Sequence, residues 1–196
     1  MKRRLTLPLF LILSGLPSLA QTPAAGGPVF VITPQNSSVK FYVKASVALT
    51  GQFDKWDASL VCASTDPGSC SLTLNVQAMS VNSGSGMKDG KLKSKDFFDV
   101  KENPLITFKS NKVTPTGPNA VEIAGIFTIR GVSKPETLSM TVTRDGSGGT
   151  LKGQMAFDRK EYGMTSGIPF IKIADRVEVN VELTGKRTGP PLVLKN

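Results

Sequence analysis

One stretch near the C-terminal end decides the fold of this 196-residue chain, and it reads Val177-Glu178-Val179-Asn180-Val181-Glu182-Leu183. Apolar and polar side chains alternate without a break. Successive side chains of a β-strand point to opposite faces of the sheet, so this period of two indicates a strand with one buried face and one wet face.

The same period recurs along the chain from Val29 onward. Its apolar members include Val39, Phe41 and Val43, then Leu72, Leu74 and Val76, then Ile123, Phe127 and Ile129, then Leu138, Met140 and Val142, then Leu151, Met155 and Phe157. Turn-forming residues separate these runs at 66–68, 116–119 and 145–149. Such short turns suit antiparallel hairpins and leave no room for helical crossovers. The pattern therefore predicts an all-β antiparallel sandwich or barrel.

Residues 84–99 break the alternation and predict one short helical segment around residues 88–98. This segment carries the paired aromatic residues Phe97 and Phe98. We expect the two rings to plug one end of the barrel or to line the mouth of a ligand cavity, and both roles can hold at once.

The first twenty residues have the layout of a cleaved secretory signal peptide. Lys2, Arg3 and Arg4 precede a short apolar run, and Ser18-Leu19-Ala20 supplies small residues at the cleavage site. The apolar run is too short for a spanning helix, which needs about 20 residues. The sequence thus predicts a periplasmic protein with a signal peptide at 1–20, a flexible leader at 21–28, one domain at 29–186 and a loose tail at 187–196.

Charge and cysteine content narrow the choice of partners. Cleavage would lower the formal net charge from +9 to +6, with the lysines scattered rather than clustered, so no nucleic acid partner is expected. The only cysteines, Cys62 and Cys70, flank an Asp-Pro-Gly turn, and in an oxidising compartment we expect them to form a disulfide at a hairpin tip.

The chain contains no histidine, which removes the usual general base and the usual metal ligand. Histidine-dependent triads are excluded. Carboxylates are present, but their spacing singles out no catalytic pair. We therefore predict no catalytic residues, no metal and no cofactor. An envelope hydrolase that uses carboxylates is the weakest alternative.

Four motifs then resemble the YceI-like proteins, which are exported bacterial proteins with an extended, lipocalin-like β-barrel. They are Asn36-Ser37-Ser38-Val39-Lys40-Phe41 with Gly51-Gln52-Phe53, Lys93 to Val100 with Pro104 to Ser110, Gly125 to Pro135, and Arg159 to Met164. The resemblance covers about Val29 to Lys186. It implies a non-catalytic carrier or sequestering protein for a polyisoprenoid or other long-chain lipid, such as an isoprenoid quinone, held along the barrel axis.

Alternation and resemblance together give the predicted ligand-binding residues. The lumen candidates are Val39, Phe41, Val43, Leu72, Leu74, Val76, Phe97, Phe98, Phe108, Ile123, Phe127, Ile129, Met140, Met155, Phe157, Val179 and Val181. The family often has histidine where this chain has Asn36, Lys91 and Arg130. Lys91 and Arg130 keep positive charge and donors, and are the headgroup candidates.

One alternative comes from another functional class. A barrel filled by its own side chains would be a solid interaction module, supporting an envelope or respiratory complex through its loops. The sequence pattern does not distinguish a filled lumen from a hollow one. A transient contact with a membrane or membrane protein fits both functions, as does either a monomer or a homodimer.

Overall fold

The computed structural model describes residues 29–167 and 170–190. The predicted signal peptide, the predicted leader and residues 191–196 of the predicted tail lie outside the described residues. The strands are β1 (Val29–Ile32), β2 (Ser38–Ala45), β3 (Leu49–Phe53), β4 (Trp56–Cys62), β5 (Cys70–Gln77), β6 (Val81–Asn82), β7 (Leu105–Gly117), β8 (Ala120–Ile129), β9 (Val132–Asp145), β10 (Gly148–Asp158) and β11 (Ile173–Thr188).

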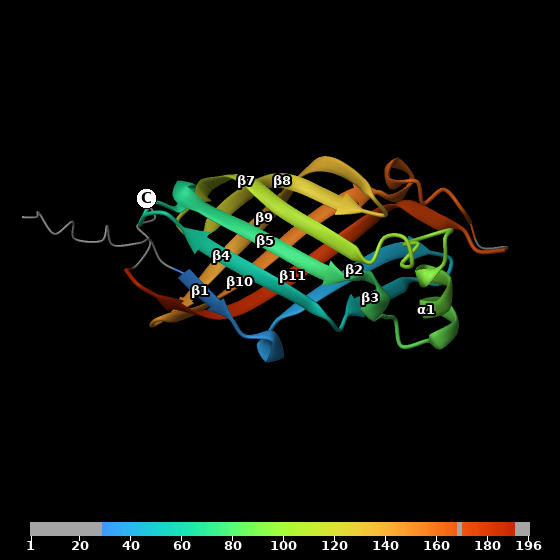
Figure 1. Ribbon diagram of the computed structural model, residues 1–196, viewed down its shortest axis with the longest axis horizontal. Coiled ribbons are helices and arrows are strands. Elements are labelled where there is room, and N and C mark those ends of the chain that lie inside the picture. Colours follow the sequence, from blue (N-terminus) through green and yellow to red (C-terminus); the bar gives the residue numbers. More distant parts are fainter. Residues whose placement is uncertain (1–28, 168–169, 191–196) are drawn as a thin grey trace, which may run out of the picture.

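All pairings between these strands are antiparallel, and the sheet closes on itself (Figure 1). Closure occurs at β1, which pairs with β11 from Val29↔Thr188 to Ile32↔Gly185 and with β4 at Phe30↔Leu60. The predicted antiparallel β-barrel is thereby confirmed. The last strand continues to Thr188, two residues beyond the predicted end of the domain.

The first three strand paths of the barrel are each interrupted once. The first path consists of β1 and β2, which both pair with β11. The second consists of β4, which pairs with β1, and β3, which pairs with β2. The third consists of β5, which pairs with β4, and β6, which pairs with β3. Short 3₁₀ turns at Pro34–Asn36 and Ala78–Ser80 break the first and third paths. The described residues therefore form eight strand paths from eleven strand segments.

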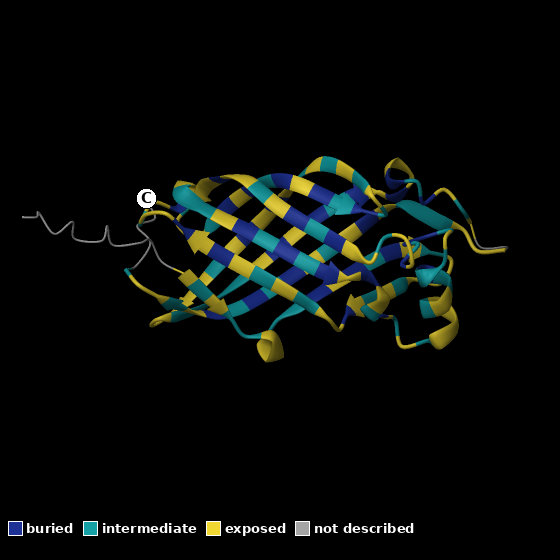
Figure 2. Ribbon diagram, in the orientation of Figure 1, coloured by how far each residue is buried: buried dark blue, intermediate teal, exposed yellow. Residues whose placement is uncertain are grey.

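Burial follows the alternation predicted from the sequence (Figure 2). Along β8, for example, Val121, Ile123, Gly125 and Phe127 are buried, whereas Glu122 and Ile126 between them are exposed. The inward-facing residues of all strands join into one apolar core. The barrel is thus lined by a continuous apolar surface.

Two aromatic clusters occupy the core toward the end of the barrel that carries the helix. Phe98 lies 6.4 Å from Phe41 and 5.8 Å from Phe53 between ring centroids. Tyr162 packs 5.5 Å from Phe127 and 5.1 Å from Phe157, and its hydroxyl donates to Glu136 at 2.9 Å. Burial, aided by that hydrogen bond, raises the pKa of Tyr162.

The predicted helix is present but lies closer to the N-terminus than predicted. α1 spans Gly86–Lys93, and Phe97 and Phe98 follow it in a series of turns. Because glycine has low helix propensity, Gly86 and Gly90 led the sequence-based prediction to place the helix too far toward the C-terminus. Phe97 and Phe98 are nevertheless both buried, as a barrel plug requires.

The predicted disulfide joins Cys62 and Cys70, which are directly paired residues of β4 and β5. Asp66 begins the intervening turn by accepting a hydrogen bond from the backbone N–H of Gly68 at 2.9 Å. The disulfide bond therefore links the two strands of the β4–β5 hairpin at the barrel end opposite α1.

We expect Cys62→Ser with Cys70→Ser to lower the free energy of unfolding by about 2–3 kcal/mol, because the disulfide closes a short loop in the unfolded chain. Urea unfolding of the double variant against the oxidised protein measures this. Reduction of the wild-type protein serves as the control and should give the same loss. A loss below about 0.5 kcal/mol would show that the native hairpin is held by its backbone pairing alone.

Candidate functional site

The interior of the barrel is the candidate site, because three apolar cavities follow one another along its long axis. Their volumes are about 140, 50 and 120 Å³ from the disulfide end, through the centre, to the α1 end. A long-chain ligand needs an apolar site with few polar partners, and ligand pockets usually measure about 300–1,000 Å³. No one of these cavities is large enough alone.

The central cavity is enclosed by most of the predicted lumen residues. It is lined by Val39, Phe41, Leu74, Val76, Phe108, Phe127, Ile129, Met155, Phe157, Val179 and Val181 from that set, with Phe53, Ile106, Leu138 and Val177 in addition. All of the predicted members are buried except Val179, which is half-buried. The aromatic rings fill most of the space here, which explains why this cavity is the smallest.

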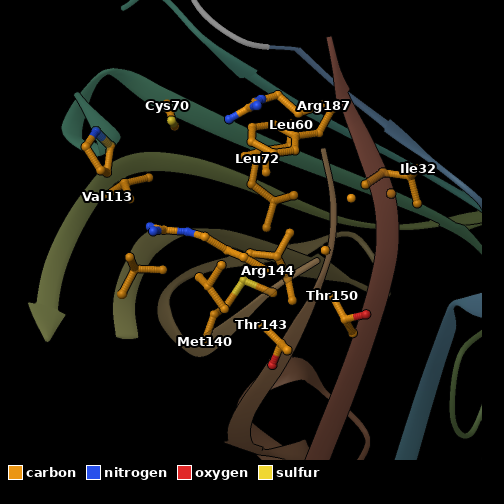
Figure 3. Close-up of a pocket in the computed structure, with 18 of the residues that line it drawn as sticks. Ile32, Leu60, Cys70, Leu72, Val113, Met140, Thr143, Arg144, Thr150 and Arg187 are labelled. Carbon is orange, nitrogen blue, oxygen red and sulfur yellow. The ribbon is translucent and has the colours of Figure 1, made fainter. Parts of the chain in front are cut away.

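The cavity at the disulfide end is the largest of the three (Figure 3). Three predicted lumen residues, Leu72, Ile123 and Met140, line it. Its other walls were not among the predicted lumen residues. They include Phe30, Ile32, Leu60, Val113, Val121 and Leu151, together with the arginines Arg144 and Arg187.

The cavity at the α1 end contains the predicted residues Val43, Phe97 and Lys91. Further apolar walls come from Val47, Leu49, Leu92, Met164, Ile171 and Ile173. Val177 lines both this cavity and the central one, so the two adjoin. Phe98 lies apart from all three cavities, within the aromatic cluster with Phe41 and Phe53.

A layer of leucines separates the central cavity from the one at the disulfide end. Leu72, Leu138 and Leu183 are almost completely buried, with 1%, 2% and 0% exposure. Gly153 faces the lumen at the same level, where an added Cβ would lie 3.0 Å from the terminal methyl of Met140 and 3.1 Å from Leu138. Since Gly153 has no side chain, the terminal methyl of the flexible Met140 can pack against its backbone.

The two predicted headgroup residues donate hydrogen bonds to adjacent residues, Asp96 and Lys95, of the segment that follows α1. Lys91 lines the α1-end cavity, donates to Asp96 at 2.6 Å and lies 5.8 Å from the centroid of the Phe97 ring. That hydrogen bond holds the pKa of the Asp96 carboxyl below its ordinary value. Arg130 instead sits in the tight β8–β9 turn with a φ of 53° and donates to the carbonyl of Lys95 at 2.9 Å. A headgroup role for either residue stays a prediction.

A buried arginine, Arg159, also lines the α1-end cavity. Arg159 is 6% exposed, and its guanidinium donates to the carbonyls of Met164, Ser166 and Ala174 and to Asp175. The hydrogen bond from Lys160, aided by the charge of Arg159, holds the pKa of Asp175 below its ordinary value. Arg159 therefore ties β10 to the start of β11 and to the loop between them.

Within the described residues, no group of three or more His, Cys, Asp or Glu side chains could hold a metal ion. In the same part of the chain, no helix has the length and apolar character needed to cross a membrane.

Comparison with known proteins places the chain among proteins of similar fold. Residues 30–185 match the family described as the YceI-like domain. A UPF0312 protein of Pseudomonas aeruginosa is 28% identical over 138 residues, which cover 66% of this chain and 72% of that protein.

Two solved structures extend the comparison. BcnA of Burkholderia cenocepacia superposes with a TM-score of 0.73 at 25% identity, covering 79% of this chain and 99% of that one. A polyisoprenoid binding domain from Saccharophagus degradans superposes with a TM-score of 0.60 at 16% identity, covering 84% and 99%. The latter likeness concerns the fold alone.

We expect Arg159→Met to lower the free energy of unfolding by about 3 kcal/mol, because three backbone carbonyls would lose their buried donor. Arg176→Met, at an exposed arginine on β11, is the matched control and should change stability by less than about 0.5 kcal/mol. Urea unfolding of both variants provides the comparison. Equal stability of Arg159→Met and the wild type would mean that apolar packing fully replaces these hydrogen bonds.

Proposed function

The chain belongs to the YceI-like domain family, and we propose that it binds a polyisoprenoid or other long-chain lipid along its barrel axis, without turning it over. The observation that carries this proposal is the row of three apolar cavities enclosed by one closed sheet. Related folds support it, since one neighbour of similar architecture is described as a polyisoprenoid binding domain. The finer choice of an isoprenoid quinone, and export to the periplasm, are parts of the same proposal.

A long chain gains free energy here mainly by leaving water. Each methylene group removed from water contributes roughly 0.8 kcal/mol, and the lining offers an apolar surface over the full length of the barrel. The central cavity of about 50 Å³ is too small for the chain as it stands. Binding therefore requires Met140 and Met155 to change rotamer, which their unbranched, polarisable side chains allow at low cost.

The alternative is a solid interaction module, and the leucine layer is the observation that favours it. Leu72 lines the cavity at the disulfide end and Leu138 the central one, and both, like Leu183, are almost completely buried. In that case the cavities would be packing defects, and the loops would carry the function.

Replacement of a single lumen residue distinguishes the two functions. Ile123 is 2% exposed and lines the cavity at the disulfide end, whereas Ile126 on the same strand is 40% exposed and faces outward. We expect Ile123→Trp to occupy the space of the ligand and abolish binding, and Ile126→Trp to leave binding unchanged. The measurement is mass spectrometry of an organic extract from each protein, purified without detergent from cells that export it.

A long-chain species near one per chain in the wild type and in Ile126→Trp, but lost in Ile123→Trp, is the expected result. Circular dichroism confirms that both variants are folded. Empty extracts from all three proteins, repeated after incubation with polyprenyl alcohols, quinones and fatty acids, would instead support the solid module. Loss of stability in Ile123→Trp with no ligand in the wild type would lead to the same conclusion.

A further inference from the structure

Two arginines at the disulfide end of the barrel occupy positions that the strand pattern reserves for apolar residues. Along β9 the inward-facing series runs Leu138, Met140, Val142 and then Arg144. Along β11 it runs Val181, Leu183, Gly185 and then Arg187. Both arginines line the cavity at the disulfide end, and Figure 3 shows the two side chains extending in the same direction, toward Val113.

The strand between them leaves room for a ligand. Gly149 of β10 is the register partner of Arg144 on one side and of Gly185 on the other. The backbone N–H of Arg187 donates to the carbonyl of Ser147 at 2.8 Å, so β11 is fixed against the β9–β10 hairpin. Gly148 and Gly149 line the cavity and add no side chain to it, so the β10 side chains in its wall are those of Thr150 and Leu151.

The positive charge of this cavity has no counterpart in the described residues. The cavity lining contains no aspartate or glutamate. Within residues 29–167 and 170–190, the hydrogen bonds and ion pairs of the structure involve neither guanidinium group, and the Arg187 Nε is buried without a partner. Leaving a buried charged donor unpaired is unfavourable. Arg144 is solvent-exposed, so this cost falls on Arg187, whose buried Nε an anionic acceptor would satisfy.

The opposite end of the barrel differs in this respect. Its cavity also contains cationic side chains, but Lys91 is paired with Asp96 and Arg159 with Asp175. The remaining cation, Lys88, is a solvent-exposed lysine of α1. Among the cations that line these two cavities, Lys88, Arg144 and Arg187 have no carboxylate partner in the described residues, and of these three only Arg187 has a buried donor atom, its Nε, without a partner.

We propose that Arg144 and Arg187 bind the anionic head of an amphiphilic ligand whose apolar tail extends into the barrel, the head being a phosphate or a carboxylate. This proposal rests on the proposed lipid-binding function and specifies the class of ligand. The planar guanidinium group matches both head groups in a bidentate manner, and charge-assisted hydrogen bonds are roughly twice as strong as neutral ones. The apolar wall of Ile32, Leu60 and Leu72 lies directly beside the arginines, where the first carbons of the tail would bind.

Ligands that share a tail and differ only in the head test this directly. The probes are geranylgeranyl phosphate against geranylgeraniol, and palmitate against hexadecanol, titrated calorimetrically into delipidated protein below their aggregation concentrations. We expect the wild type to bind at least one anionic member about tenfold or more tightly than its alcohol, because two charge-assisted contacts are gained. The two pairs also show whether phosphate or carboxylate is preferred.

We expect Arg144→Gln with Arg187→Gln to remove this preference while alcohol binding changes less than about twofold. Arg176→Gln is the matched control, since it removes an exposed arginine of the same strand, and it should keep the preference. Equal binding of acid and alcohol by the wild type would overturn the proposal and leave lipid binding intact. Loss of the preference in Lys91→Gln or Arg130→Gln instead would also overturn it, by placing the head at the α1 end. Failure of the wild type to bind any of the four probes would overturn both the headgroup site and the proposed function.

Discussion

The rest of the structure depends on the pairing of β11 with three other strands. Its first part pairs with β2, its last part with β1, and almost its whole length with β10. Without the four residue pairs from Val29↔Thr188 to Ile32↔Gly185, the sheet would have two open edges, which expose unpaired N–H and C=O groups. Closure removes those edges and also forces all inward-facing side chains to share one lumen, so the same hydrogen bonds create the fold and the candidate site.

The alternation of apolar and polar residues predicted which side chains face the lumen, because a register shift of one residue would turn every apolar side chain of a strand outward. The orientation of Val39, Phe127 or Val181 thus followed from alternation alone. What alternation could not supply was the packing across the barrel. Whether Leu72 and Leu138 meet or leave a gap depends on partners far apart in sequence. Arg144 and Arg187 could have been predicted as lumen residues from alternation. In β9, Arg144 is two residues beyond Val142. In β11, Gly185 and then Arg187 continue the inward-facing series beyond Leu183.

The cavities themselves have an energetic consequence. Side chains beside an empty cavity lose contacts, at a cost of about 24 cal/mol per Å³ for a closed apolar void. A barrel selected only as a solid support would gain stability by filling that space, for instance with a larger residue at Val121. Retaining valine at this position instead leaves space beside the flexible Met140, and an apolar guest would restore the missing contacts.

The two ends of the barrel differ in whether their cationic side chains are paired with carboxylates. This difference would orient an amphiphilic ligand in the lumen. At the α1 end the carboxylates of Asp96 and Asp175 already neutralise Lys91 and Arg159, and the chain uses these pairs to fasten its own loops. At the disulfide end Arg144 and Arg187 make no such internal bonds within the described residues, yet their strands are fixed by the hairpin and by the Ser147 carbonyl. A charged head carried deep into the barrel would lose its hydration without compensation, whereas a head held at this end stays close to water. An amphiphilic guest is therefore oriented by desolvation as well as by attraction, with its head between the arginines and its tail directed through the leucine layer toward the aromatic clusters.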